Sequence, residues 1–263
     1  MTTKIGIHGL TSCYGCQLSM AIVQRILDVA ETFDIEYFYM LSSQGEISPV
    51  DVAFVEGSVS TTQDEQELRK IRDNADIVVA VGSCAIHGGV QGILADEGIS
   101  YREAFQDVYG DSKMDYEGRI AQPIDTIIDV DYRLPGCPPE EPEIMYYMAT
   151  LAMGSWPEEK DYPVCAECRR AGNPCILIER GEPCLGPVTV AGCKARCITY
   201  DVPCVGCRGP VPHETAWFDS LARTFKNIGM DRDTVQKRMA IFSARHPHMQ
   251  EMLEKIYGTE EQA

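Results

Sequence analysis

The spacing of twelve cysteines is the feature that most constrains how this 263-residue chain can fold. One Cys-x2-Cys pair lies near the N-terminus, two single cysteines follow at long intervals, and eight more are crowded into residues 165–207. A Cys-x2-Cys pair places two thiolates on one turn, where both reach the same metal ion or cluster. In chain order the cysteines divide into three sets of four. The first set is Cys13, Cys16, Cys84 and Cys137, and the second set is Cys165, Cys168, Cys175 and Cys184. The third set is Cys193, Cys197, Cys204 and Cys207.

Metal binding explains these cysteines better than disulfide bonds do. The N-terminal residues contain neither a basic segment followed by an apolar run nor a twin-arginine motif, so we expect a cytoplasmic location. Disulfides are rare in that reducing compartment, which leaves a secreted disulfide scaffold as the weaker alternative. No apolar run approaches the ~20 residues of a membrane-spanning helix, and we expect no membrane span.

The charge of the chain restricts its partners. The formal net charge is −17 and the sequence pI is about 4.6, which argues against binding to nucleic acid or to an anionic membrane surface, because both require clustered Lys and Arg. A hydrophobic content of 44% is sufficient for a sizeable folded core.

Residues 1–153 read as alternating strands and helices, which predicts an α/β domain with a doubly wound parallel sheet of the flavodoxin-like kind. The predicted strands are Lys4–Leu10, Ile35–Leu41, Val50–Val55, Ala75–Val81 and Ile127–Leu134. The predicted helices are Leu18–Val29, Gln63–Asn74 and Pro142–Met153.

The predicted sheet gathers the first set of cysteines. Cys13 and Cys16 follow the first strand, Cys84 follows a middle strand, and Cys137 follows the last. Ligands of open α/β sheets bind outside the carboxyl ends of the strands, so these loops meet at one edge. A redox Cys-x2-Cys of the thioredoxin kind is the alternative for Cys13 and Cys16, but such a motif needs no partners from other loops.

Residues 154–263 predict a second domain of a different kind. Its first part is irregular and rich in cysteine, glycine and proline, so bound metal would substitute for a conventional core. Two helices are predicted after it, one carrying the apolar stripe from Trp217 to Ile228 and one from Val235 to Phe242 with Asp231 as its cap. Met249, Leu253 and Ile256 suggest a third.

Zinc remains open as an alternative for the second and third sets, because paired Cys-x2-Cys motifs are also typical of zinc ribbons. A four-cysteine site among glycine loops at the sheet edge suits a cubane cluster better than a single zinc ion, and this favours iron–sulfur throughout. The division between the second and third sets follows only from chain order, and exchanges near Cys184 and Cys193 stay possible.

Other polar residues give weaker signals. His87 lies three residues after Cys84. It either donates a hydrogen bond to a cluster sulfur or partner subunit, or is a solvated loop residue. His246 and His248 are predicted to be surface residues. Glu56 ends a strand at the functional edge, where a carboxylate that caps a loop amide is the favoured interpretation over a contact with a partner or a proton route. No catalytic triad, Walker loop or dinucleotide motif is present, and we expect no catalytic residue in this chain.

Six motifs resemble those of the small subunit of nickel–iron hydrogenases, in the same order. They are Thr11-Ser12-Cys13-Tyr14-Gly15-Cys16, Val55-Glu56-Gly57-Ser58, Gly82-Ser83-Cys84, Pro135-Gly136-Cys137-Pro138-Pro139, Cys184-Leu185-Gly186-Pro187 and Pro203-Cys204-Val205-Gly206-Cys207. The segment Trp217-Phe218-Asp219 is similar to the one that follows them in that family.

The resemblance implies three [4Fe-4S] clusters: a proximal cluster on the first set, a distal cluster on the second and a medial cluster on the third. It also implies two partners, a large subunit that carries the nickel–iron site and a further electron-transfer subunit, diaphorase-like or heterodisulfide-reductase-like. Many family members have a histidine as one distal ligand, and this chain has Cys165 in that place. Many have a three-iron medial cluster, whereas Cys197 offers a fourth ligand here. Many carry Glu where this chain has Gln17. These departures resemble cytoplasmic multisubunit hydrogenases of the sulfhydrogenase delta-subunit type.

Two other classes stay open at this point. One is the iron–sulfur subunit of a respiratory quinone oxidoreductase, which shares the proximal-cluster fold but has no counterpart to the eight later cysteines. The other is a zinc-stabilised interaction protein without a redox role.

Overall fold

The computed structural model describes residues 2–22, 31–41, 46–95, 98–113, 117–212, 215–243, 251, 253–255 and 257–258. The chain divides into two compact units, residues 1–159 and 160–263, which are treated separately below.

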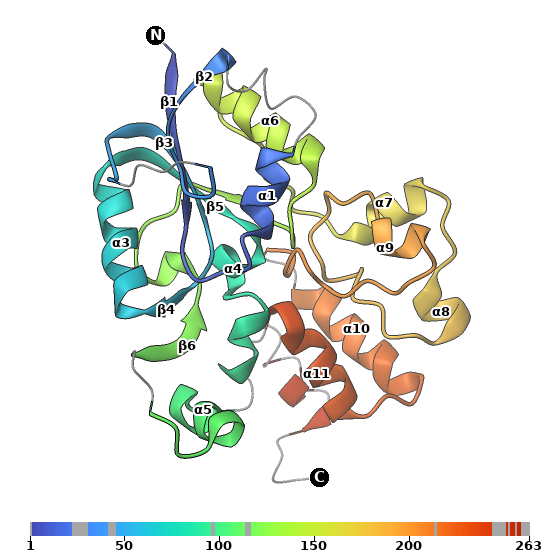
Figure 1. Cartoon of the computed structure of the whole chain (residues 1–263). Helices are drawn as coiled ribbons and strands as arrows, with labels where there is room; N and C mark the ends of the chain where they lie inside the picture. The colour runs from blue at the N-terminus through green and yellow to red at the C-terminus, as the bar shows by residue number, and fades with distance from the viewer. Residues whose placement is uncertain are drawn as a thin grey trace. The chain divides into compact units, whose positions relative to one another are not determined.

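A five-stranded parallel sheet forms the centre of the first unit (Figure 1). Its strands are β1 (Thr3–Gly9), β2 (Phe33–Phe38), β3 (Val50–Glu56), β5 (Ala75–Val81) and β7 (Tyr132–Leu134). They lie in the order β2-β1-β3-β5-β7, and all neighbours pair in parallel. Counting only these strands the order is 2-1-3-4-5, the flavodoxin-like topology, so the expected fold class is confirmed.

Helices cover both faces of this sheet because its strands are apolar on both sides. Val52 and Phe54 face α1 (Gly15–Ala21) and α6 (Glu141–Ala152), whereas Val55 faces α3 (Thr62–Asp73). In Figure 1 α3 lies on one side of the sheet and α1 and α6 lie on the other.

The start of α3 shows how the sequence sets an element boundary. Thr61 accepts a hydrogen bond from the main-chain N–H of Asp64, and the Asp64 carboxylate accepts one from the N–H of Thr61. This capping box satisfies N–H groups that the first helical turn leaves unpaired.

The last strand and the first helix begin at other residues than predicted. The last strand is only Tyr132–Leu134, because residues 124–131 form a short 3-10 turn and an irregular segment instead. Within that segment Asp131 accepts a hydrogen bond from the N–H of Val78 on its carboxylate at 2.7 Å, and its own N–H donates to the carbonyl of Val78 at 3.0 Å. The first helix begins earlier than expected, at Gly15 and not Leu18, and the expected part of it from residue 23 to 29 lies outside the described residues.

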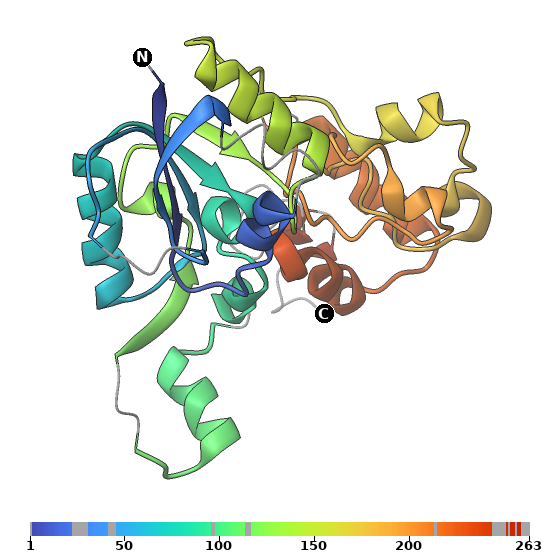
Figure 2. The same cartoon turned by 45° about the horizontal axis from the view of Figure 1, so that its top comes forward.

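A second, two-stranded sheet was not anticipated. β4 (Val59–Thr61) pairs antiparallel with β6 (Gly118–Gln122). Helix α5 (Tyr101–Tyr109) lies next to β6, apart from the five-stranded sheet (Figure 2). The remaining elements of this unit are α4 (Gly82–His87) and two 3-10 helices, η1 (Val90–Ala95) and η2 (Ile124–Thr126).

The second unit combines cysteine-bearing loops with helices. The short helices are α7 (Val164–Arg170), α8 (Ile176–Arg180) and α9 (Arg196–Thr199), and the longer ones are α10 (Thr215–Asn227) and α11 (Arg232–Ser243). The expected stripes are buried at Phe218, Leu221 and Phe225 in α10 and at Val235 and Met239 in α11, where they share one core with cysteines of the second and third sets.

The ends of these helices agree in part with expectation. Asp231 caps α11, since its carboxylate accepts from the N–H of Thr234 at 2.8 Å. Of the residues proposed for a third helix, Leu253 is buried, while Met249 and Ile256 lie outside the described residues. Within the described ranges, no helix is long and apolar enough to cross a membrane.

Candidate metal centres

The first set lies on three loops at the carboxyl edge of the five-stranded sheet. Cys13 and Cys16 flank the start of α1 after β1, Cys84 lies in α4 directly after β5, and Cys137 follows β7. The main-chain N–H of Ser83 donates to the carbonyl of Gly136 at 2.9 Å, which joins the β5 and β7 loops. The topology thus gathers cysteines that are up to 124 residues apart in the sequence (137 minus 13).

The four sulfurs of the first set are close enough to influence each other's charge. Burial raises the pKa of the Cys16 thiol, and the negative charges of Glu56, Cys84 and Cys137 raise it further. Burial raises the pKa of Cys84 to about 11; a hydrogen bond from Gln91 opposes the rise, while Cys137 and Cys13 add to it. Burial, followed by the charge of Cys13, raises the pKa of Cys137.

The gathering of four sulfurs distinguishes a metal centre from a redox thiol pair. A thioredoxin-like Cys-x2-Cys needs no partners from other loops, whereas Cys84 and Cys137 lie close enough to Cys16 for their charges to raise its pKa. Buried sulfurs that repel one another become thiolates when a cationic centre replaces their protons. The donor set therefore fits a metal cluster better than a thioredoxin-like motif.

Glycines leave the space that the sulfurs occupy. A Cβ atom on Gly82, at φ +80°, would lie 2.4 Å from Sγ of Cys16, and one on Gly89, at φ +66°, would lie 2.6 Å from Sγ of Cys84. Both positions have left-handed backbone that favours glycine. The loops therefore form a cradle around the sulfurs that other side chains would fill.

Glu56 supports this cradle from the end of β3. Its side chain is only 3% exposed, and its Oε2 accepts a hydrogen bond from the main-chain N–H of Cys16 at 3.1 Å. The expectation that Glu56 caps a loop amide is confirmed. Burial raises the pKa of this carboxyl, against the effect of its hydrogen bonds with Cys16 and Gln17.

The second set gathers around α7 and α8. Burial raises the pKa of Cys165 to about 12, and the charges of Cys184, Cys168 and Cys175 raise it further, so all four sulfurs lie within reach of one another. A Cβ atom added to Gly186 would lie 3.4 Å from Sγ of Cys165 and 3.5 Å from Sγ of Cys184.

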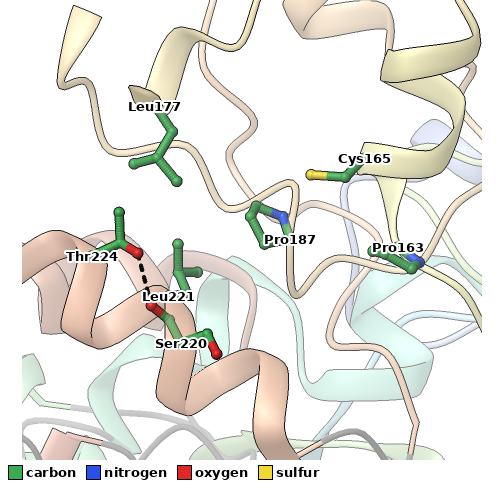
Figure 3. Close-up of a pocket in the computed structure, with 7 residues that line it drawn as sticks. All are labelled: Pro163, Cys165, Leu177, Pro187, Ser220, Leu221 and Thr224. Atoms are coloured by element: carbon green, nitrogen blue, oxygen red, sulfur yellow. Dashed lines mark hydrogen bonds between the residues drawn. The ribbon is translucent and has the colours of Figure 1, made fainter. Parts of the chain in front are cut away.

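A cavity of about 290 Å³ opens beside the second set (Figure 3). Its lining is mostly apolar, from Leu177 on α8, Pro187 on the loop after Cys184 and Leu221 on α10, and the sulfur of Cys165 points into it. Apolar walls lower the local dielectric around the sulfur.

The third set is gathered less completely. Cys204 lies close enough to Cys184 and Cys207 for their charges to raise its pKa, after burial, which is the larger cause. For Cys193, by contrast, burial raises the pKa, and the largest opposing effects are a hydrogen bond from the Arg196 N–H and the charge of Arg208. Cys193 and Cys197 both pack against the same core as Cys204.

Main-chain N–H groups point at the sulfurs of both later sets. The N–H of Cys204 donates to Sγ of Cys184 at 3.3 Å. Ala195, at φ 54°, donates its N–H to Cys193, and Gly206, at φ +80°, donates to Cys204. Left-handed residues that turn successive N–H groups toward one point form the concavities in which anionic iron–sulfur clusters bind.

No group of three or more His, Cys, Asp or Glu side chains within the described ranges is arranged to hold a single metal ion. A tetrahedral zinc ion needs sulfurs about 2.3 Å from its centre. The ligands of a four-iron cluster bind four different iron atoms and lie farther apart. The first and second sets each offer four thiolates, the number that a four-iron cluster takes with one on each iron.

His87 is the last residue of α4 and is half-buried. His213, His246 and His248 lie outside the described residues.

Sequence reasoning missed three polar residues around the cysteines. Gln91 donates to Sγ of Cys84, Glu167 accepts from the N–H groups of Gly192 and Lys194, and Arg208 is 2% exposed next to Cys207. Arg208 and Glu167 adjoin cysteines in the sequence and could have been noticed, but an Arg or Glu between cysteines is ordinarily a surface residue.

A protein-family model matches residues 13–151 of the chain; it describes the NADH ubiquinone oxidoreductase, 20 Kd subunit. The match includes the first set of cysteines and ends before the second.

Similar proteins extend across the later cysteines. The sulfhydrogenase 2 subunit delta of Pyrococcus furiosus is 39% identical over 208 residues, which cover 79% of this chain and 86% of that protein. A subunit of the F420-non-reducing hydrogenase (vhu) of Methanococcus voltae is 30% identical over 271 residues, covering 91% of this chain and 93% of that protein.

Among solved structures, a chain of an NAD+-reducing [NiFe]-hydrogenase in the H2-reduced state is similar with a TM-score of 0.53 and 30% identity. The similarity covers 60% of this chain and 95% of that one.

Proposed function

This chain belongs to the family of the 20 kDa subunit of NADH–ubiquinone oxidoreductase and, within it, to the small subunits of nickel–iron hydrogenases, and from that membership we propose that it holds three [4Fe-4S] clusters. It is an oxidoreductase subunit that acts with a large subunit, so the resemblance seen in its motifs is confirmed. When bound, the clusters supply one-electron transfer between the dihydrogen site of the large subunit and a further redox subunit.

One observation carries this proposal: four cysteines from three loops meet in a glycine-lined cradle at the edge of the sheet. In the proposal Cys13, Cys16, Cys84 and Cys137 hold the proximal cluster, and residues 1–153 are its domain. Residues 154–263 hold the other two, with the second set as distal ligands and the third set as medial ligands.

The other side chains of the sites prepare them for fast electron transfer. Leu177, Pro187 and Leu221 give the second set apolar surroundings, and N–H groups from Ala195 and Gly206 stabilise the negative charge of sulfurs in the third set. Apolar, preorganised surroundings reduce the reorganisation that accompanies a change of charge.

Two parts of the proposal concern the setting of the chain. The further subunit would be diaphorase-like or heterodisulfide-reductase-like, and the complex would be cytoplasmic. Both similar proteins from Pyrococcus and Methanococcus are named as subunits of hydrogenases, which supports a multisubunit assembly.

The hydrogenase assignment is favoured over a quinone oxidoreductase subunit by the second unit. The family model ends at residue 151, whereas the similarity to hydrogenase subunits extends over 79% and 91% of the chain. The glycine-lined site of four cysteines at the sheet edge suits a cubane cluster and disfavours a zinc-stabilised interaction protein.

The test is metal analysis of the chain purified without oxygen, together with its large subunit. We expect about twelve iron atoms and twelve acid-labile sulfides per chain, beyond the iron of the large subunit, and electron paramagnetic resonance (EPR) signals of three interacting clusters after reduction. Zinc with no visible absorption, or about four iron atoms, would contradict the three-cluster proposal.

A further inference from the structure

Gln91 is a polar side chain that reaches the cradle of the first set from the 3-10 helix η1. Its Nε2 donates hydrogen bonds to Sγ of Cys84 at 3.3 Å, to Oγ of Ser58 at 3.2 Å and to the carbonyl oxygen of Thr11 at 3.3 Å. An amide nitrogen has two hydrogens. With three acceptors in reach, at least one of these hydrogens is shared between two acceptors.

The three acceptors come from three different loops. Thr11 follows β1, Ser58 follows β3, and Cys84 lies in α4 after β5. Thr11 and Ser58 are themselves joined, since the N–H of Ser58 donates to the carbonyl of Thr11 at 2.9 Å. Gln91 therefore fixes the position of the Cys84 sulfur relative to the loop that carries Cys13 and Cys16.

The backbone around Gln91 is shaped for this contact. Gly88 and Gly89 have φ values of +86° and +66°, and a Cβ on Gly89 would lie 2.6 Å from Sγ of Cys84 and 3.1 Å from Oε1 of Gln91. The chain turns back sharply here, and the N–H of Gly92 donates to the carbonyl of Gly89 at 3.1 Å.

We propose that Gln91 is a positioning residue that raises the reduction potential of the first cluster by donating a hydrogen bond to its Cys84 ligand. The inference rests on the proposed function, because it requires a cluster on the first set. Reduction adds negative charge to the cluster and its sulfurs. A donor to a ligand sulfur stabilises the reduced form more than the oxidised form, and hydrogen bonds to sulfur are a principal determinant of cluster potential.

The experiment is an EPR-monitored redox titration of the assembled complex. Gln91→Met keeps the length of the side chain and removes the donor. The expected result is a shift of the first cluster to lower potential, by at least a tenfold change in its one-electron reduction equilibrium, or about 59 mV. Gln91→Glu keeps the shape but places a negative charge there, and the expected shift is larger.

Ser58→Ala is the matched control, because it removes one of the other acceptors of Gln91 and leaves the sulfur contact in place. We expect the one-electron reduction equilibrium of the first cluster in Ser58→Ala to change by less than threefold from the wild type. A wild-type potential in Gln91→Met with the cluster present would overturn the inference. So would loss of the first cluster in both Gln91 variants, since Gln91 would then be only structural.

The wild-type titration separates this inference from the proposed function. A wild-type complex that shows no cluster signal from the first set contradicts the proposed function itself. A wild-type signal that Gln91→Met leaves unmoved contradicts only the role of Gln91.

Discussion

The main-chain N–H of Cys204 donates a hydrogen bond to the sulfur of Cys184, with 3.3 Å between the nitrogen and the sulfur. The carbonyl of Cys204 in turn accepts from the N–H of Leu185 at 3.0 Å. The two loops run side by side, so the last cysteine of the second set touches the backbone of the third. Chain order alone could not divide the sets at this point. The charge of Cys184 raises the pKa of Cys165 in the second set and also that of Cys204 in the third, so Cys184 lies near both.

Replacement of Cys184 tests this division. If Cys184 belongs to the second set, Cys184→Ala leaves three thiolates on that cluster and lowers the iron content by about one to four atoms per chain, with the third-cluster EPR signal retained. Cys207→Ala is the matched variant and should remove the third-cluster signal and spare the second. If both variants lose the same signal, the division between the sets is wrong.

The cradle of the first set has no room for a methyl group at Gly82. Gly82→Ala would place a carbon 2.4 Å from Sγ of Cys16 at a φ of +80°, so we expect loss of the first cluster, about four iron atoms, and of hydrogen-dependent dye reduction by the complex. Gly110→Ala is the control, because Gly110 has a φ of +61° in the same unit but open space around it. The Gly110→Ala variant has only the backbone strain of alanine at positive φ, about 1–2 kcal/mol. Equal iron loss in both variants would show that strain, and not the missing space, is responsible.

The parts of the fold that the sequence predicted well have strong local signals. β5 was placed at its observed bounds, Ala75–Val81, because a continuous apolar run ends at a glycine on one side. The convergence of the first set also followed from the sequence, since parallel strands bring their carboxyl ends together wherever their loops carry cysteines.

The parts that were missed depend on distant partners. β4 and β6 are short, and each forms only because the other, far away in the sequence, supplies its hydrogen bonds. The contact of Gln91 with Cys84 depends on a tight turn at two glycines, and an isolated glutamine gives no sign of its acceptor. Similarly, nothing in the order of the cysteines indicates how closely Cys184 approaches Cys204.

Arg208 stabilises the fold of the loops that carry the third set. Its side chain is 2% exposed, and its Nε donates to the carbonyl oxygens of Val190 and Ala191 at 3.1 and 2.9 Å. Arg208→Met keeps much of the volume but leaves two buried acceptors unsatisfied, at about 1–3 kcal/mol each. We expect a loss of about 2–6 kcal/mol in the free energy of unfolding, measured by denaturant titration. Arg223→Met, on α10, is the comparison for loss of a positive charge elsewhere in this unit, and an equal effect there would contradict a specific role for Arg208.

His8 makes the stability of the first unit depend on pH. It lies in β1, is 1% exposed and stacks on Tyr37 with 4.8 Å between ring centroids. Burial lowers its pKa to about 4 from the usual 6.5. As the pH falls below 6.5 the unfolded chain takes up a proton on this histidine, while the folded chain does not until about pH 4, so stability is lost across that range.

Replacement of His8 by leucine removes this proton uptake. Between pH 7 and pH 5 the wild-type chain should lose about 2 kcal/mol more stability than His8→Leu. The measurement is the midpoint of thermal unfolding at several pH values, with the two proteins compared at each, because acid effects on the cysteine ligands are common to both. The difference between the two profiles therefore isolates the histidine. Parallel profiles from pH 7 to pH 5 would mean that His8 is not held in its neutral form by burial, and that the stacking on Tyr37 tolerates the imidazolium.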